Sequence, residues 1–102
     1  MMAMAGSGKS VSITVKSFAT LREIMDAQIQ LEMPEGATVR LLLAELTGRY
    51  PGLEGMIFSS PDTLRDLVNI LRNGRNIQFL AGLDTPLSDG DLVALFPPAA
   101  GG

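Results

Sequence analysis

The stretch of this sequence best suited to chemistry is its end, Phe96-Pro97-Pro98-Ala99-Ala100-Gly101-Gly102. The reactive group there is the α-carboxylate of Gly102, which is ionised at neutral pH and is therefore a poor electrophile. It would need activation by another protein before it could be transferred. The small side chains of Ala99, Ala100, Gly101 and Gly102 would let this end enter a narrow channel in such a partner. We therefore interpret the segment as a carboxylate that is presented to other proteins.

Two prolines set the direction of this end. Pro97 and Pro98 each fix φ at about −65° and lack an N–H group, so strand pairing should stop there. The preceding residues 91–96 are apolar enough to form a buried strand, and proline favours an extended backbone at Phe96. Fully extended, residues 97–102 would reach about 20 Å, at roughly 3.3 Å per residue. The sequence predicts a tail that is stiff at its base and slender at its tip.

The two glycines also have an ordinary explanation. Glycine is a common residue, and most chain ends are merely frayed. The pair therefore gains weight only if the rest of the chain folds in a way that uses such a tail.

The composition excludes several classes of protein. The 102 residues have a hydrophobic fraction of 46%, which indicates one globular domain, and a net charge of −3 without a basic cluster, which argues against nucleic-acid binding. No apolar run approaches the roughly 18 residues of a membrane span, so we expect no membrane partner. The lack of a signal-peptide core and of cysteine is compatible with a cytoplasmic location.

Histidine and cysteine are both absent. The chain consequently has no imidazole base, no thiolate and no usual zinc ligand set. We expect no metal site, no cofactor bound by the chain itself, and a carrier or substrate rather than a self-sufficient enzyme.

Two segments superficially resemble ligand-binding loops. Residues 3–10 fit a relaxed phosphate-binding loop, but that loop needs a strand before it and a helix after it, and a strand pattern follows here. Residues 88–91 (Ser-Asp-Gly-Asp) suggest calcium, but the further oxygen ligands that a calcium loop needs are missing. We expect neither to be a site.

Two alternating segments, residues 11–16 and 27–33, predict an antiparallel hairpin. The inward-facing positions are Val11, Ile13, Val15, Ala27, Ile29, Leu31 and Met33. By the same alternation Phe18 faces outward. Packing in the core or at its rim is the favoured role for this ring, and a partner contact is the alternative.

A helix capped by Thr38 should follow, and Pro51-Gly52 should end it. Its apolar stripe is Val39, Leu42, Leu43, Leu46 and Tyr50. Residues 60–62 (Ser-Pro-Asp) suggest the start of a short helix. Residues 68–72 and 75–80 predict a hairpin around Asn73-Gly74. A solvated tip is the favoured role for Arg72 and Arg75, and contact with an anion or a partner is the alternative.

The order strand, strand, helix, strand, strand, strand allows the last strand to lie parallel to the first in the centre of the sheet. This is an α+β fold of the β-grasp (ubiquitin-like) type, a mixed sheet of four to five strands on one main helix. We expect a flexible extension over residues 1–10, the β-grasp domain over 11–96 and the extended tail over 97–102.

Several segments resemble the small subunit of molybdopterin synthase, a ubiquitin-like sulfur carrier of the MoaD and ThiS type. They are Phe18–Glu23, Pro34–Val39 followed by Leu42, Val68–Ile77, Leu87–Asp91 and Leu95–Gly102. The similarity spans nearly all of residues 11–102, and residues 52–67 fit the pattern only loosely.

The resemblance implies a mechanism. An adenylyltransferase of the ubiquitin-activating type would use ATP and Mg²⁺ to adenylate Gly102, and sulfide would replace AMP to leave a thiocarboxylate. The large subunit of molybdopterin synthase would then use that sulfur to build the dithiolene of the molybdenum cofactor. The partner contacts would come from Phe96, Pro97, Pro98, Ala99, Ala100 and Phe18.

Other functions remain open at this point. The chain could be a ubiquitin-like modifier that Gly102 joins to target lysines, a carrier for another sulfur pathway, or a β-grasp module that binds partners without covalent chemistry.

Overall fold

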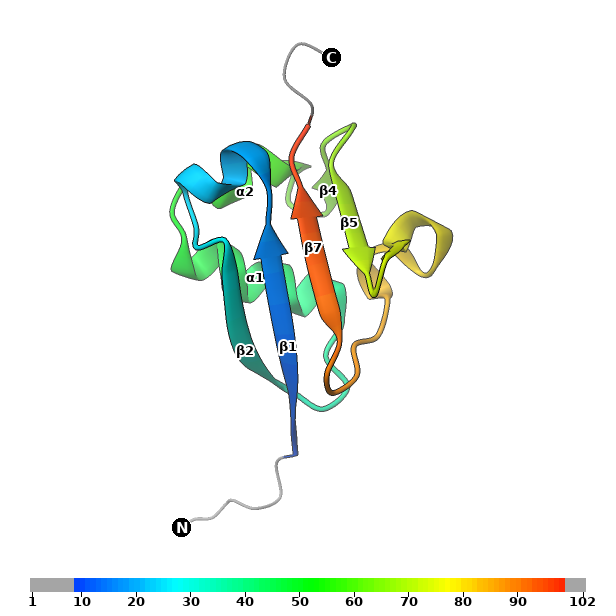
Figure 1. The fold of residues 1–102 in the computed structure, drawn as a ribbon. Helices are drawn as coiled ribbons and strands as arrows, with labels where there is room; N and C mark the ends of the chain where they lie inside the picture. The colour runs from blue at the N-terminus through cyan, green and yellow to red at the C-terminus, as the bar shows by residue number, and fades with distance from the viewer. Residues whose placement is uncertain (1–8, 99–102) are drawn as a thin grey trace.

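The strands that open and close the described part of the chain lie next to each other in the middle of one sheet (Figure 1). The computed structural model describes residues 9–98. Its strands are β1 (Ser10–Ser17), β2 (Gln28–Pro34), β3 (Phe58–Ser60), β4 (Thr63–Leu64), β5 (Asn69–Arg72), β6 (Arg75–Asn76) and β7 (Leu92–Phe96). Its helices are α1 (Val39–Arg49), α2 (Leu53–Ile57) and the 3₁₀ helices η2 (Ala19–Glu23), η3 (Ile77–Phe79) and η4 (Gly82–Asp84).

The main sheet has five strands in the order β2-β1-β7-β5-β6. Strand β1 pairs antiparallel with β2 and parallel with β7, and β7 pairs antiparallel with β5. A parallel pair needs a long crossover between its strands, and α1 lies within that connection. The predicted β-grasp fold is confirmed, and so is the predicted place of the last strand beside the first.

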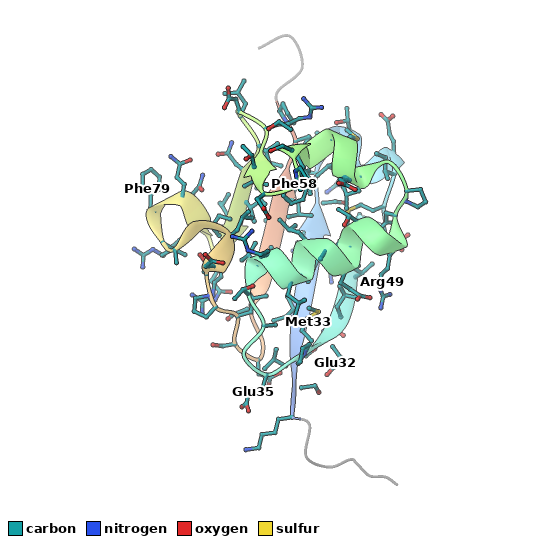
Figure 2. The ribbon with its side chains drawn as sticks, turned by 180° about the vertical axis from the view of Figure 1, so that it is seen from behind. Glu32, Met33, Glu35, Arg49, Phe58 and Phe79 are labelled. Atoms are coloured by element: carbon teal, nitrogen blue, oxygen red, sulfur yellow. The ribbon has the colours of Figure 1, made fainter. Side chains whose placement is uncertain are left out.

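Helix α1 lies across one face of this sheet and closes the core (Figure 2). The Thr38 hydroxyl accepts a hydrogen bond from the Leu41 amide at 3.3 Å, so it caps the helix as predicted. The buried helix positions are Val39, Leu42, Leu43 and Leu46. They meet the buried sheet positions Val11, Ile13, Val15, Leu31, Met33, Ile70, Val93 and Leu95 in one cluster. Among residues 9–98, no α-helix covers the opposite face of the sheet (Figure 1).

The segment between α1 and β5 differs from the prediction. The short helix is α2, which starts at Leu53, and not at the Ser-Pro-Asp segment. Leu53 and Ile57 are fully buried, and their spacing of four residues is that of one helical face. Pro61 and Asp62 instead form the turn between β3 and β4, which pair as a separate two-stranded sheet. Proline suits the second position of such a turn because its φ is already fixed.

The hairpin after β5 is shorter than predicted. Asn73 and Gly74 adopt positive φ, 51° and 86°, as the turn prediction requires. Strand β6 stops at Asn76, however, because the Asn76 side chain accepts a hydrogen bond from the Gln78 amide at 3.0 Å and starts η3. Residues 77–80 are therefore not a strand.

Asp91 joins this hairpin to the start of β7. Its carboxylate accepts hydrogen bonds from Arg72 Nε at 2.8 Å, from Asn73 Nδ2 at 2.9 Å and from the Ser88 amide at 2.8 Å. Burial raises the pKa of Asp91, but the bonds from Ser88, Asn73 and Arg72 outweigh it, so the pKa lies below its ordinary value. The prediction of a solvated tip is thus wrong for Arg72, which is engaged with a buried carboxylate, and Arg75 is exposed.

A lowered pKa makes the contribution of Asp91 to stability depend on pH. The contribution is present above the ordinary aspartate pKa and is lost as the pH falls through the lowered folded-state value. We predict that Asp91→Asn lowers the free energy of unfolding at pH 7 by about 1–3 kcal/mol, because hydrogen bonds to a buried charge are weakened. The variant should also lose less stability than the parent between neutral and strongly acidic pH.

Urea denaturation at both pH values measures this, with exposed Asp66→Asn as the control. Equal effects of the two substitutions would contradict the assignment.

Candidate functional site

The candidate site is the end of β7, where the sheet stops and the predicted tail begins. The last pairing of β7 with β5 joins Phe96 to Asn69, so the ladder ends at the first of the two prolines, as predicted. Pro97 is buried and Pro98 is half-buried. The predicted reactive residues Gly101 and Gly102, and the predicted contact residues Ala99 and Ala100, lie outside the described residues.

The rings of Phe18 and Phe96 stack on each other at this point. Their centroids are 4.4 Å apart and their planes are 9° from parallel. The structure brings them together because β1 and β7 run parallel with Ser17 opposite Leu95, which places the next residue of each strand side by side. The Phe18 amide also donates a hydrogen bond to the Leu95 carbonyl at 3.2 Å.

Each ring is half-buried and lies on the sheet face that α1 leaves open, because the neighbouring residues Ser17, Leu95 and Pro97 are buried toward the core. The prediction that Phe18 faces outward is confirmed. The Phe18 ring packs at the rim of the fold and also leaves an apolar surface exposed. Its position is therefore compatible with both predicted roles, packing and contact with a partner.

An arginine extends the stack. The Arg22 guanidinium carbon lies 5.3 Å from the centroid of the Phe18 ring, and Arg22 Nε donates a hydrogen bond to the Ser17 carbonyl at 2.9 Å. Both contacts hold the cation in place over the ring face, the geometry of a cation–π interaction. Helix η2 makes this possible because buried Leu21 anchors the helix that carries Arg22. The residue pattern before β2 did not indicate this interaction, because it depends on how η2 places Arg22 beside the end of β1.

The open face divides into a polar side and an apolar side. Strand β2 contributes exposed Gln28, Gln30 and Glu32 along one edge. Toward the middle the half-buried apolar residues are Leu71 of β5, Leu92, Ala94 and Phe96 of β7, and Phe18. The register places Leu71 opposite Ala94, so these side chains form a continuous apolar strip that ends at the phenylalanine stack. An apolar strip beside a polar rim is the composition of a protein-binding surface.

The β3–β4 hairpin borders the other side of the exit. A groove of about 370 Å³ is lined there by Ser59, Thr63, Leu64, Arg65, Asp66 and Pro98. Arg65 is fixed in this wall because its Nε donates a hydrogen bond to the Gly55 carbonyl at 2.7 Å. Part of residues 52–67, the segment that fits the family pattern only loosely, thus lies beside the base of the tail at Pro98.

The two ligand-like segments have other roles. Strand β1 begins at Ser10, where a phosphate-binding loop would need a helix, and residues 1–8 lie outside the described part. Asp89 accepts a hydrogen bond from the Ser12 amide at 2.7 Å, and Asp91 is taken up by Arg72 and Asn73. Within residues 9–98 the structure contains no group of three or more side chains placed to hold a metal ion and no helix long and apolar enough to cross a membrane.

Comparison with known proteins identifies the family of this chain and supports its fold. The ThiS family matches residues 15–102. Small archaeal modifier protein 3 of Haloferax volcanii is 38% identical over 93 residues, which cover 90% of this chain and 100% of that protein. The molybdopterin synthase sulfur carrier subunit of Mycobacterium tuberculosis is 33% identical over 94 residues, which cover 90% and 99%.

A solved structure of a relative has the same fold as this chain. The small archaeal modifier protein 1 of Methanosarcina acetivorans superposes with a TM-score of 0.79 at 38% identity, covering 93% of this chain and 100% of that one. These relatives include modifier proteins as well as a molybdopterin synthase subunit, so two of the functions considered from the sequence occur among them. The family match runs through the diglycine at Gly102, beyond the stacked phenylalanines that mark the end of the sheet. The chain belongs to the ThiS family of ubiquitin-like sulfur carriers.

Proposed function

We propose that this chain is the small subunit of a molybdopterin synthase, a non-catalytic sulfur carrier whose reactive group is the Gly102 carboxylate. The observation that carries the proposal is the central position of β7, which ends at the Phe18–Phe96 stack and continues into the proline pair. A rigid strand buried between two neighbours fixes where the following residues start. A fixed starting point limits the positions that the reactive end can take. Fewer positions favour group transfer, because the reacting atoms are then oriented before they meet.

The proposed chemistry has two steps. The Gly102 carboxylate attacks the α-phosphorus of ATP on an adenylyltransferase of the ubiquitin-activating type, which releases pyrophosphate and forms an acyl-adenylate. Sulfide then attacks the acyl carbon, AMP leaves with the bonding electrons, and a thiocarboxylate remains. This chain supplies the acyl group and its positioning, while ATP and Mg²⁺ belong to the partner. No histidine or cysteine is available in the chain to do more.

The proposed destination of the sulfur is the molybdenum cofactor. In the molybdopterin reading, the thiocarboxylate enters the large synthase subunit and supplies the dithiolene sulfur. The M. tuberculosis relative named as a molybdopterin synthase sulfur carrier subunit supports this reading.

A second candidate function deserves equal testing, because the H. volcanii and M. acetivorans relatives are named modifier proteins. In this reading, target lysines accept the activated acyl group and form isopeptide bonds. Both functions begin with the same activated Gly102, so one chain can serve both.

The docking surface proposed for the activating partner is the apolar strip with its phenylalanine stack. Aromatic side chains at the centre of an interface contribute most to affinity. Arg22 lies over the Phe18 ring and adds a positive charge, which suits a partner surface that carries a carboxylate beside an apolar pocket.

We predict that Gly102→Ala abolishes or strongly reduces conversion to the thiocarboxylate, since a methyl group next to the carboxylate obstructs a narrow channel. The protein is incubated with the adenylyltransferase encoded in the same genome, ATP and sulfide, and its intact mass is measured. The unmodified chain should gain the mass difference between sulfur and oxygen. Pyrophosphate release without this gain contradicts the carrier function, and isopeptide-linked conjugates in cells then favour the modifier function. Production of the dithiolene after addition of the large subunit tests the molybdopterin assignment itself.

A second prediction concerns docking. Phe96→Ala should weaken binding to the adenylyltransferase about tenfold or more, because it removes one half of the stacked pair. Phe79→Ala is the matched control, since Phe79 is 76% exposed and projects from η3 at the side of the fold (Figure 2). Titration by calorimetry measures both affinities, and urea denaturation shows whether each variant is folded. Equal affinities of the two variants would contradict the proposed surface.

A further inference from the structure

Lysine is scarce in this chain. The sequence contains two lysines, Lys9 and Lys16, against six arginines. An amine becomes a nucleophile once it loses its proton, whereas an arginine guanidinium stays protonated in proteins. If an activated carboxylate acylates this chain, the side-chain amines open to it are those two.

Lys16 lies on the surface that the proposed function assigns to the partner. It is half-buried on the open face of β1, opposite Ala94 of β7 and Gln28 of β2. Phe18, one half of the aromatic stack, follows two residues later on the same face. A partner that covers the stack therefore covers this amine as well.

Lys9 lies at the other end of the sheet and is exposed. Its carbonyl accepts a hydrogen bond from the Glu35 amide at 3.1 Å, so its backbone is held at the point where β1 begins. That point is the pole opposite to the end of β7, close to the labelled Glu35 (Figures 1 and 2). Among residues 9–98, the Lys9 amine takes part in none of the ion pairs, so no carboxylate of the described fold holds it.

The tail of the same molecule is too short to reach Lys9. The nine steps from Lys9 to Phe18 run along the extended strand β1 and span about 30 Å at roughly 3.3 Å per residue. Residues 97–102 start at the Phe18 end and reach about 20 Å. The tail would have to turn back along the whole sheet, so a bond to Lys9 must come from a second copy.

We propose that Lys9 is the acceptor through which one copy of this chain is joined covalently to the next. The inference rests on the proposed activation of Gly102. The neutral Lys9 Nζ attacks the acyl carbon of the Gly102 adenylate of another copy, an isopeptide bond forms, AMP leaves with the bonding electrons, and the amine proton passes to water. Because the acceptor and the exit of the tail lie at opposite poles, successive copies join head to tail and each keeps its open face accessible.

The test uses the untagged chain of 102 residues, detected with an antibody against it and expressed in its source organism, as the parent, as Lys9→Arg and as Lys16→Arg. Trypsin leaves a distinctive product because no lysine or arginine occurs after Arg75. A second copy therefore leaves residues 76–102 attached to its acceptor peptide. Linkage at Lys9 gives that remnant on residues 1–16, linkage at Lys16 gives it on residues 10–22, and linkage at the N-terminal amine gives it on residues 1–9.

We expect the remnant on residues 1–16. We also expect the dimer band, normalised to thiocarboxylate-bearing monomer, to fall about tenfold or more in Lys9→Arg, since arginine keeps the charge and cannot be acylated. In Lys16→Arg, which alters the docking surface, the readout is the site of the remnant and not its amount, and the remnant should still lie on residues 1–16. A remnant at Lys16 or at the N-terminus overturns the inference, and so does a thiocarboxylate-bearing chain that forms no copy-to-copy bond. Those results leave the proposed function intact. Absence of both thiocarboxylate and isopeptide products overturns the proposed function together with this inference.

Discussion

The parallel pairing of β1 with β7 is the constraint on which the rest of this structure depends. It joins residues 14–17 to residues 92–95 in the centre of the sheet, so every other element is arranged around two strands that are remote in sequence. The pairing buries Val15 against Val93 beneath α1, and it brings Phe18 beside Phe96 on the other face. One ladder thus completes the hydrophobic core and fixes the surface at which the final strand ends.

In the proposed function, the partner proteins carry out the chemistry, and this chain supplies the acyl group and the fold that positions it. Within residues 9–98 the buried polar groups serve the fold. Ser17 donates a hydrogen bond to the Asp26 carbonyl, Thr85 to the Gly82 carbonyl, and Asp91 receives the bonds that tie the β5–β6 turn to β7. The chain belongs to the ThiS family, and in the proposed function it contributes a reactive end and a docking surface.

Where hydrophobic periodicity was long and clear, the sequence was sufficient to predict the fold. The alternation in β1 and β2, the stripe of α1 and the Asn73-Gly74 turn each identified their element, because local pattern and tertiary burial favour the same conformation there. Prediction failed where side chains bond locally to the backbone or where elements are very short. Asn76 ended β6 early through its bond to the Gln78 amide, and the Pro61-Asp62 pair formed a turn rather than a helix start.

The candidate site was predictable in its residues and not in its contacts. Phe18, Phe96 and the prolines stand out by type, but the stacking of the rings follows from the register of two distant strands. The approach of Arg22 needed helix η2, which the turn-like sequence before β2 did not indicate. Buried Leu21 and Met25, four residues apart, were the signal that this connection is structured.

The same central ladder links folding to the completion of synthesis. A ribosome produces β1 well before β7, and the strand that pairs with the second edge of β1 arrives only with residues 92–96, so the core stays open until β7 has emerged. Contacts of such long sequence separation also slow the final collapse, because a large loop must be closed before they contribute. A nascent chain that stalls before β7 therefore lacks the completed sheet, and in the proposed function it would present neither the folded surface nor the reactive end to an activating partner.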